Sequence, residues 1–266
     1  MLCVQFALRK LGVLGSAPLA SGDVASAASA LQAYVERIVD PALQTASTTS
    51  ASAGRLTHVI SVCSDAAEFA ENEVFSKLPR SSDSRMPRVC TVFGMHPLYC
   101  KRYFDDSSIE SFLISKLRDR RTTAFGEIGL DYHDFGDAAN YAPRDLQLRV
   151  FQRQLELLVA EGHGQPLVLH TREADDDTLA LLSRHLPRDY PIDVHCYSSS
   201  RSFADRIAAS FSCVVFGLAG NVTFKNNDAL RQVVDSLPID RVSVFLLCGV
   251  QLLERFTHIL QLWKKN

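Results

Sequence analysis

The chain has 266 residues, of which 47% are hydrophobic, with a formal net charge of −2 and an isoelectric point near 6.4. This length is sufficient for one large domain, and the charge excludes binding of nucleic acid through a strongly basic overall field. The seven cysteines include no CxxC pair, which argues against a disulfide framework and for a reducing compartment. We therefore expect a cytoplasmic protein, with the nucleus or mitochondrion as alternatives. The apolar runs are too short to cross a bilayer, so we expect no membrane association.

The first 54 residues differ in character from the rest. Residues 31–43 predict one helix, and residues 44–54 form a Ser/Thr/Ala tract of the kind found in linkers. Arg9, Lys10 and the absence of an acidic residue before Asp23 are features of transit peptides. We expect residues 1–54 to be a divergent N-terminal segment and residues 55–266 to form the domain that carries the chemistry.

From residue 55, short β-branched apolar runs alternate with segments of helical spacing. The predicted strands are 57–62, 88–97, 122–130, 165–171, 191–197, 213–220 and 241–248. The predicted helices that follow them are 66–78, 107–120, 143–162, 173–186, 200–211, 227–237 and 252–263. Buried strands that alternate with helices predict a parallel α/β sheet. Seven such units, with an eighth strand unrecognised near the N-terminus, fit an incomplete TIM-type (β/α)8 barrel whose last unit is altered. An open doubly wound sheet is the alternative.

Four successive predicted strands carry an imidazole or a carboxylate near their C-terminal ends. These residues are His96, Glu127, His170 and His195, and Arg172 follows His170. Because the C-terminal ends of barrel strands form one rim, we expect these side chains to converge. Two histidines and a glutamate in apolar surroundings match the ligands of Zn²⁺ or a similar divalent cation, which would also neutralise the buried Glu127. A purely structural ion pair between Glu127 and Arg172 is the alternative.

Six short motifs follow one another in a fixed order along the chain. They are GMHP (94–97), GEIGLDYH (126–133), HTREA (170–174), HCYSSS (195–200), FGLAGNVTF (216–224) and PIDR (238–241). In this order they resemble the motifs of the TatD family of metal-dependent deoxyribonucleases. The resemblance implies a TIM-type barrel, DNA as the substrate, hydrolysis of its phosphodiester bonds, and one or two divalent cations (Mg²⁺, Mn²⁺ or Zn²⁺). We expect the chain to be a monomer.

The resemblance also implies roles for individual residues. Glu127, His170 and His195 match metal ligands, with Glu127 bridging two cations. Glu127, His96 and Arg172 match catalytic residues, the last two near the scissile phosphate. Cleavage within the strand and 3′–5′ exonuclease action both stay open.

Two motifs of the family are missing from the chain. Its members begin with a strand that ends in histidine-x-histidine, whereas no two of the eight histidines here are two positions apart. Members also end their last strand with glutamate–threonine–aspartate, whereas Leu247 stands near the position expected for that aspartate. The losses leave three hypotheses: a nuclease with reduced activity, a non-catalytic barrel that binds metal or nucleic acid, and a metal-dependent hydrolase of amides or lactones.

Overall fold

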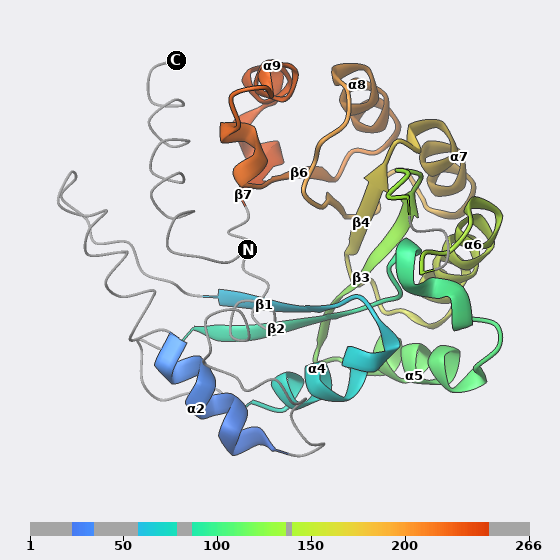
Figure 1. The fold of residues 1–266 in the computed structure, drawn as a ribbon, viewed down its shortest axis with the longest axis vertical. Helices are drawn as coiled ribbons and strands as arrows, with labels where there is room; N and C mark the ends of the chain where they lie inside the picture. Colours follow the sequence, from blue (N-terminus) through green and yellow to red (C-terminus); the bar gives the residue numbers. More distant parts are fainter. Residues whose placement is uncertain (1–22, 35–57, 79–86, 137–139, 245–266) are drawn as a thin grey trace, which may run out of the picture.

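The computed structural model describes residues 23–34, 58–78, 87–136 and 140–244, most of which form one curled parallel sheet with helices on its outside (Figure 1). Each strand pairs in parallel with the next strand along the chain, so the spatial order is the sequence order. Over the residues described, this order has no switch point, which excludes the doubly wound alternative and confirms an incomplete TIM-type barrel there. The strands are β1 (His58–Cys63), β2 (Arg88–Phe93), β3 (Thr122–Asp131), β4 (Leu167–Arg172), β5 (Ile192–Val194), β6 (Val214–Leu218) and β7 (Val242–Val244).

Helices follow the strands as predicted, within a few residues at each end. The α-helices that cover the sheet are α4 (Phe69–Ser76), α5 (Ser107–Arg118), α6 (Arg144–Glu161), α7 (Asp175–His185), α8 (Arg201–Ser210) and α9 (Asp228–Ser236). Short 3-10 helices are η2 (Ala66–Glu68), η3 (Pro97–Arg102), η4 (Gly220–Thr223) and η5 (Ile239–Arg241). No helix in these residues is long and apolar enough to span a membrane.

The N-terminal helix lies earlier than the sequence predicts. Helix α2 (Val24–Tyr34) overlaps only the start of the helix predicted at 31–43, and it contacts α4. The rest of that prediction, the tract at 44–54, the basic residues before Asp23, the position of Leu247 and the last predicted helix lie outside the described residues. The boundary at residue 55 therefore stays a prediction.

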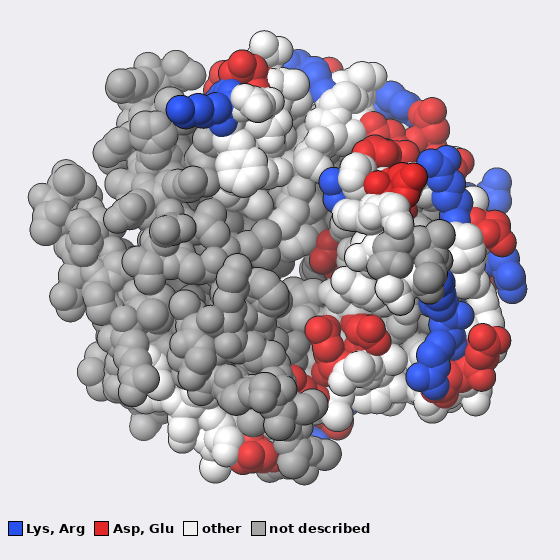
Figure 2. All heavy atoms as spheres, in the orientation of Figure 1, with Lys and Arg blue, Asp and Glu red and all other residues white. Residues whose placement is uncertain are grey.

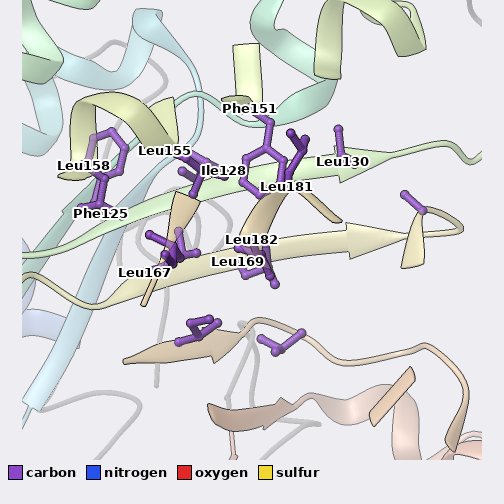
Figure 3. Close-up of a cluster of buried hydrophobic side chains, with 14 of the residues drawn as sticks. Phe125, Ile128, Leu130, Phe151, Leu155, Leu158, Leu167, Leu169, Leu181 and Leu182 are labelled. Atoms are coloured by element: carbon purple, nitrogen blue, oxygen red, sulfur yellow. The ribbon is translucent and has the colours of Figure 1, made fainter. Parts of the chain in front are cut away.

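The two faces of the sheet carry different side chains. Phe125, Ile128 and Leu130 point from β3 toward the helices, where Phe151 and Leu155 of α6 meet them (Figure 3). On the opposite, inner face, a smaller cluster contains Val62, Val92, Ala124 and Val168. Alternation along each strand thus separates a helix-packed layer from the barrel interior.

A β-bulge at Glu127 interrupts this alternation. Gly126 pairs with Val168 and Ile128 pairs with Leu169, so Glu127 is an extra residue with no partner on β4. Phe125 and Ile128 can therefore both face the helices although they are three positions apart, and Glu127 is left on the inner face. The bulge explains how a carboxylate enters an otherwise apolar strand.

Glycines beside the bulge allow the backbones to approach closely. Gly129 has φ +149°, and a Cβ at this position would lie 1.8 Å from the carbonyl oxygen of His170. Gly126 has φ +153°, and its Cβ would lie 2.4 Å from the carbonyl oxygen of Val168. Only glycine fits both the conformation and the space.

We expect Gly129→Ala to destabilise the protein by about 3 kcal/mol or more, because the methyl group would collide with the β4 backbone as well as require an unfavourable φ. Gly164→Ala is the matched control, since Gly164 also has a positive φ (+90°) but nothing lies within 4 Å of the place that its methyl group would take. The control should lose only about 1 kcal/mol. Urea unfolding of both variants measures the difference, and equal losses would contradict the steric argument.

Candidate metal site

Three of the predicted site residues converge at the C-terminal end of the sheet. His170 Nδ1 lies 2.7 Å from Glu127 Oε1 and 3.1 Å from His96 Nε2. One donor atom from each of these residues lies within 4.8 Å of the others. The side chains come from β3, β4 and the loop after β2, so strand adjacency alone brings them together.

His195 approaches this cluster, whereas Arg172 contacts an aromatic ring beside it. His195 Nε2 is 4.0 Å from Glu127 Oε2, and His170 Nδ1 is closest to the other carboxylate oxygen, Oε1. The Arg172 guanidinium lies over the ring of Phe135, with Cζ 5.1 Å from its centroid. Among the described residues, the ion pairs of Glu127 are to His170 and His195, so the alternative pairing with Arg172 is not what the structure contains.

Asp131 is a site residue that the sequence analysis did not single out. It ends β3, is 3% exposed, and its Oδ2 lies 3.0 Å from His170 Nε2. A carboxylate that accepts a hydrogen bond from one imidazole nitrogen leaves the other nitrogen free to bind a metal. This is the usual arrangement around metal-binding histidines. The sequence could have indicated Asp131, because alternate residues of a strand face the same side and Asp131 comes two residues after Gly129 in β3.

His96 was predicted to lie near the end of a strand at 88–97, but this prediction is wrong. Strand β2 ends at Phe93, and His96 is the N-cap of η3, where Nδ1 accepts a hydrogen bond from Leu98 N–H at 3.2 Å. The neutral ring must then carry its proton on Nε2, the nitrogen that points into the site. His96 is therefore suited to donate a hydrogen bond there.

Burial and neighbouring charges perturb the titration of the cluster. Burial and the neighbouring His170 lower the pKa of His96 to about 3, and burial also lowers the pKa of His195. For His170, burial opposes the charged form, but hydrogen bonds with Asp131 and Glu127 outweigh it and raise the pKa to about 9. For Glu127, burial opposes ionisation, but His195 and His170 outweigh it, so its pKa is lowered. Hydrogen bonding to His170 also outweighs burial at Asp131 and lowers the pKa of its carboxyl group. The directions of these shifts favour charged carboxylates beside His170.

The donor set fits a divalent cation. If His170 Nδ1 carries a proton for Glu127, the protonated Nε2 of His96 faces it at only 3.1 Å, which is repulsive. A cation in place of that proton would satisfy Nδ1 and Oε1 and would balance the second carboxylate. Tetrahedral bonds of about 2.0–2.1 Å place two ligand atoms about 3.3 Å apart, so His170 Nδ1 and Glu127 Oε1, which lie 2.7 Å apart, would move slightly apart around a cation.

Two glutamines of α6 form hydrogen bonds with the backbone of Met95, next to His96, and of Asp131. Gln154 accepts from the backbone N–H of Met95 at 2.9 Å and donates to its carbonyl at 3.1 Å. Gln147 accepts from the N–H of Asp131 at 2.8 Å and donates to its carbonyl at 2.9 Å. Since two turns of helix separate Gln147 and Gln154, one helix face fixes the backbone next to both His96 and Asp131.

The sequence profile of the TatD related DNase family matches residues 36–244. The chain belongs to this family. Among curated proteins, the TatD-family chain is 34% identical over 153 residues to "3′-5′ RNA nuclease TATDN2" of Homo sapiens, covering 58% of this chain and 19% of that protein. It is 31% identical over 128 residues to "Uncharacterized metal-dependent hydrolase YabD" of Bacillus subtilis, covering 48% of this chain and 47% of that protein. The chain thus spans less than half of these relatives.

Solved structures of this fold agree with the barrel. A TatD family hydrolase from Entamoeba histolytica aligns with a TM-score of 0.61 at 20% identity, over 80% of this chain and 66% of that chain. An uncharacterized amidohydrolase from Saccharomyces cerevisiae aligns with a TM-score of 0.59 at 20% identity, over 82% of this chain and 69% of that chain. At this identity the match establishes the shared TatD-type fold.

The raised pKa of His170 predicts a pH-dependent stability in metal-free protein. Protonated His170 stabilises the folded state. This stabilisation is fully present below pH 6.5, the pKa in the unfolded chain, and is lost as the pH rises toward about 9, the pKa in the folded protein. We expect His170→Asn to remove up to about 3 kcal/mol of this decline between those limits. Unfolding in urea with chelator at several pH values measures it. The exposed His163→Asn should keep the decline, and a wild-type slope in His170→Asn would contradict the assignment.

Proposed function

We propose that this chain is a metal-dependent hydrolase that cleaves phosphodiester bonds in DNA. The observation that carries the proposal is the convergence of Glu127, His170 and His96 at the C-terminal end of a barrel sheet, with His195 beside them. Membership of a family named for its DNase members and relatives named as nucleases and metal-dependent hydrolases support it.

Glu127 and His170 are the central ligands in this proposal, and His195 is the third. The two oxygens of Glu127 face different imidazoles, Oε1 toward His170 and Oε2 toward His195, which suits a carboxylate that bridges two cations. Asp131 keeps the Nδ1 lone pair of His170 directed at the site by accepting from Nε2. A divalent ion held there would stabilise negative charge on phosphoryl oxygens and lower the pKa of water. Mg²⁺, Mn²⁺ and Zn²⁺ are all compatible with these ligands.

His96 and Arg172 act on the substrate rather than on the metal in this proposal. The Nε2–H of His96 is a donor with a fixed direction, because η3 holds the other nitrogen. Arg172 presents a guanidinium, whose planar set of donors suits phosphate, and Phe135 supports it from one side. Both would donate to oxygens of the scissile phosphate, where charge increases in the transition state.

The second candidate function is a non-catalytic barrel that binds metal or nucleic acid. The observation that favours it is the absence of a histidine-x-histidine pair anywhere in the sequence, which removes two ligands that active members of the family carry. Hydrolysis of an amide or lactone by the same site is the third candidate, and a panel of such substrates tests it.

We expect the purified chain to cleave DNA when Mg²⁺, Mn²⁺ or Zn²⁺ is added, and Glu127→Gln to reduce the rate by about 100-fold or more, because the substitution removes a ligand charge. Glu156→Gln is the matched control on the surface of α6, and its rate should equal that of the parent. Gel analysis of end-labelled strands measures cleavage and separates endonuclease from 3′–5′ exonuclease products. No cleavage above the Glu127→Gln background rejects catalysis in favour of the non-catalytic barrel.

A second comparison separates ligands from substrate-binding groups. His170→Ala should weaken metal binding by about 100-fold, whereas His96→Ala should leave metal affinity within about twofold and lower the cleavage rate by about 100-fold. Isothermal calorimetry with Mn²⁺ measures the affinities. The exposed His163→Ala should change neither quantity. An equal loss of affinity in His96→Ala would make His96 a ligand.

A further inference from the structure

A cleft lies at the opposite end of the sheet from the candidate metal site. It has a volume of about 350 Å³, and its walls come from the start of β2, the turn between α5 and β3, and the turn between α6 and β4. We call it the basal cleft. Its lining includes Arg88, Arg120, Arg121, Thr123, His163 and Gly164. Volumes of this size are typical of sites for small molecules.

The length of β3 separates the basal cleft from the candidate metal site. Thr122 begins this strand and lines the cleft, whereas Asp131 ends it beside His170. The ten residues of β3 span about 30 Å. A small molecule in the basal cleft would therefore not contact the residues that we propose to carry out hydrolysis, which lie at the C-terminal ends of the strands.

The lining of the basal cleft is basic. It contains three arginines and no aspartate or glutamate. Asp119, just before the cleft residues in the α5–β3 turn, is paired with Arg121, whose Nη2 lies 2.7 Å from Asp119 Oδ2. This hydrogen bond lowers the pKa of Asp119, so the carboxylate stays ionised and balances the charge of Arg121.

Arg88 and Arg120 have no such counterion. Among the residues that the structure describes, neither side chain forms an ion pair or a hydrogen bond, and both are exposed. The carboxylate of Glu161, at the end of α6, is already engaged by Arg118 at 2.6 Å. The basal cleft thus holds two guanidinium groups that no described carboxylate neutralises.

This excess of positive charge is local. Elsewhere on the surface Arg102, Arg201 and Arg206 are each paired with an aspartate. Figure 2 shows basic and acidic side chains interspersed over the described surface that it presents. With a formal net charge of −2, the protein attracts anions only where its arginines gather.

The chemistry of the lining favours phosphate. A guanidinium group presents a planar set of donors that matches two oxygens of a phosphate group. The lining contains no phenylalanine, tyrosine or tryptophan, so it offers charge and hydrogen bonds and no aromatic carbocycle for a base or sugar. At Gly164 nothing lies within 4 Å of the place that a Cβ would take, so this side of the cleft is open to an entering molecule.

We propose that the basal cleft binds a small phosphate-bearing anion through Arg88 and Arg120, with Arg121 held beside them by Asp119. Inorganic pyrophosphate and the phosphate ester of a small organic molecule share this chemistry. The bound anion would connect the start of β2 with the turn that precedes β3 and would stabilise the folded protein. The site is independent of the proposed hydrolysis.

Isothermal calorimetry of the metal-depleted full chain tests this inference with two probes, inorganic pyrophosphate and glycerol 3-phosphate. At least one should bind at a single site, and the tighter one identifies the source of the phosphate. Arg88→Ala and Arg120→Ala should each weaken its binding by about tenfold, because each removes a charge-assisted contact. Arg88→Lys and Arg120→Lys should weaken it by only about threefold, because lysine keeps the charge but not the paired donors.

Arg184→Ala is the matched control, since Arg184 is an exposed arginine of α7 that forms no ion pair with a described residue and does not line the cleft. Arg172→Ala controls for an anion bound at the candidate metal site instead. Both should bind the probe like the parent, and urea unfolding verifies that all variants are folded. The inference is overturned if neither probe binds, if Arg88→Ala and Arg120→Ala keep parental affinity, or if either control loses as much as they do.

Discussion

The bulge that places Glu127 on the inner face of β3 is the constraint on which the site depends. A buried carboxylate without partners costs several kcal/mol, so the chain can retain it only where cationic groups meet it. The extra residue between Gly126 and Ile128 keeps the apolar side chains against α6 and turns the carboxylate toward β4 and β5. Core packing and site geometry are thus set by the same local irregularity.

The imidazoles around Glu127 differ because different neighbours hold their second nitrogens. Asp131 forms a hydrogen bond with Nε2 of His170, whereas Nδ1 of His96 accepts a hydrogen bond from Leu98 N–H. The first ring can therefore offer a lone pair to a cation, and the second offers a proton. Two histidines only 4.2 Å apart between ring centroids gain complementary chemistry from hydrogen bonds formed outside the site.

Sequence patterns predicted the regular part of this structure well. The β-branched runs and helical spacing located the strands and helices within a few residues, because each strand is buried on both faces and each helix has one apolar side. Glu127, His170 and His195 could be brought together from strand order alone. His96 was assigned to a strand because GMHP continues an apolar run, whereas Pro97 in fact starts η3 and makes His96 its N-cap.

Residues that act through the backbone escaped prediction. Gln147 and Gln154 look like the polar side of an amphipathic helix, yet they are 3% and 1% exposed. A buried amide that pairs with a strand-end backbone cannot be distinguished by pattern from one that faces water.

The two amides of α6 have a consequence for how the protein can vary. Because one helix anchors the chain beside both His96 and Asp131, the loops after β2 and β3 share a common support. Insertions within those loops can alter the substrate surface without disturbing the anchored ends. A rotation of α6 about its axis, by contrast, would displace His96 and Asp131, the partner of the proposed ligand His170, together, so both halves of the candidate site would be lost in a single step.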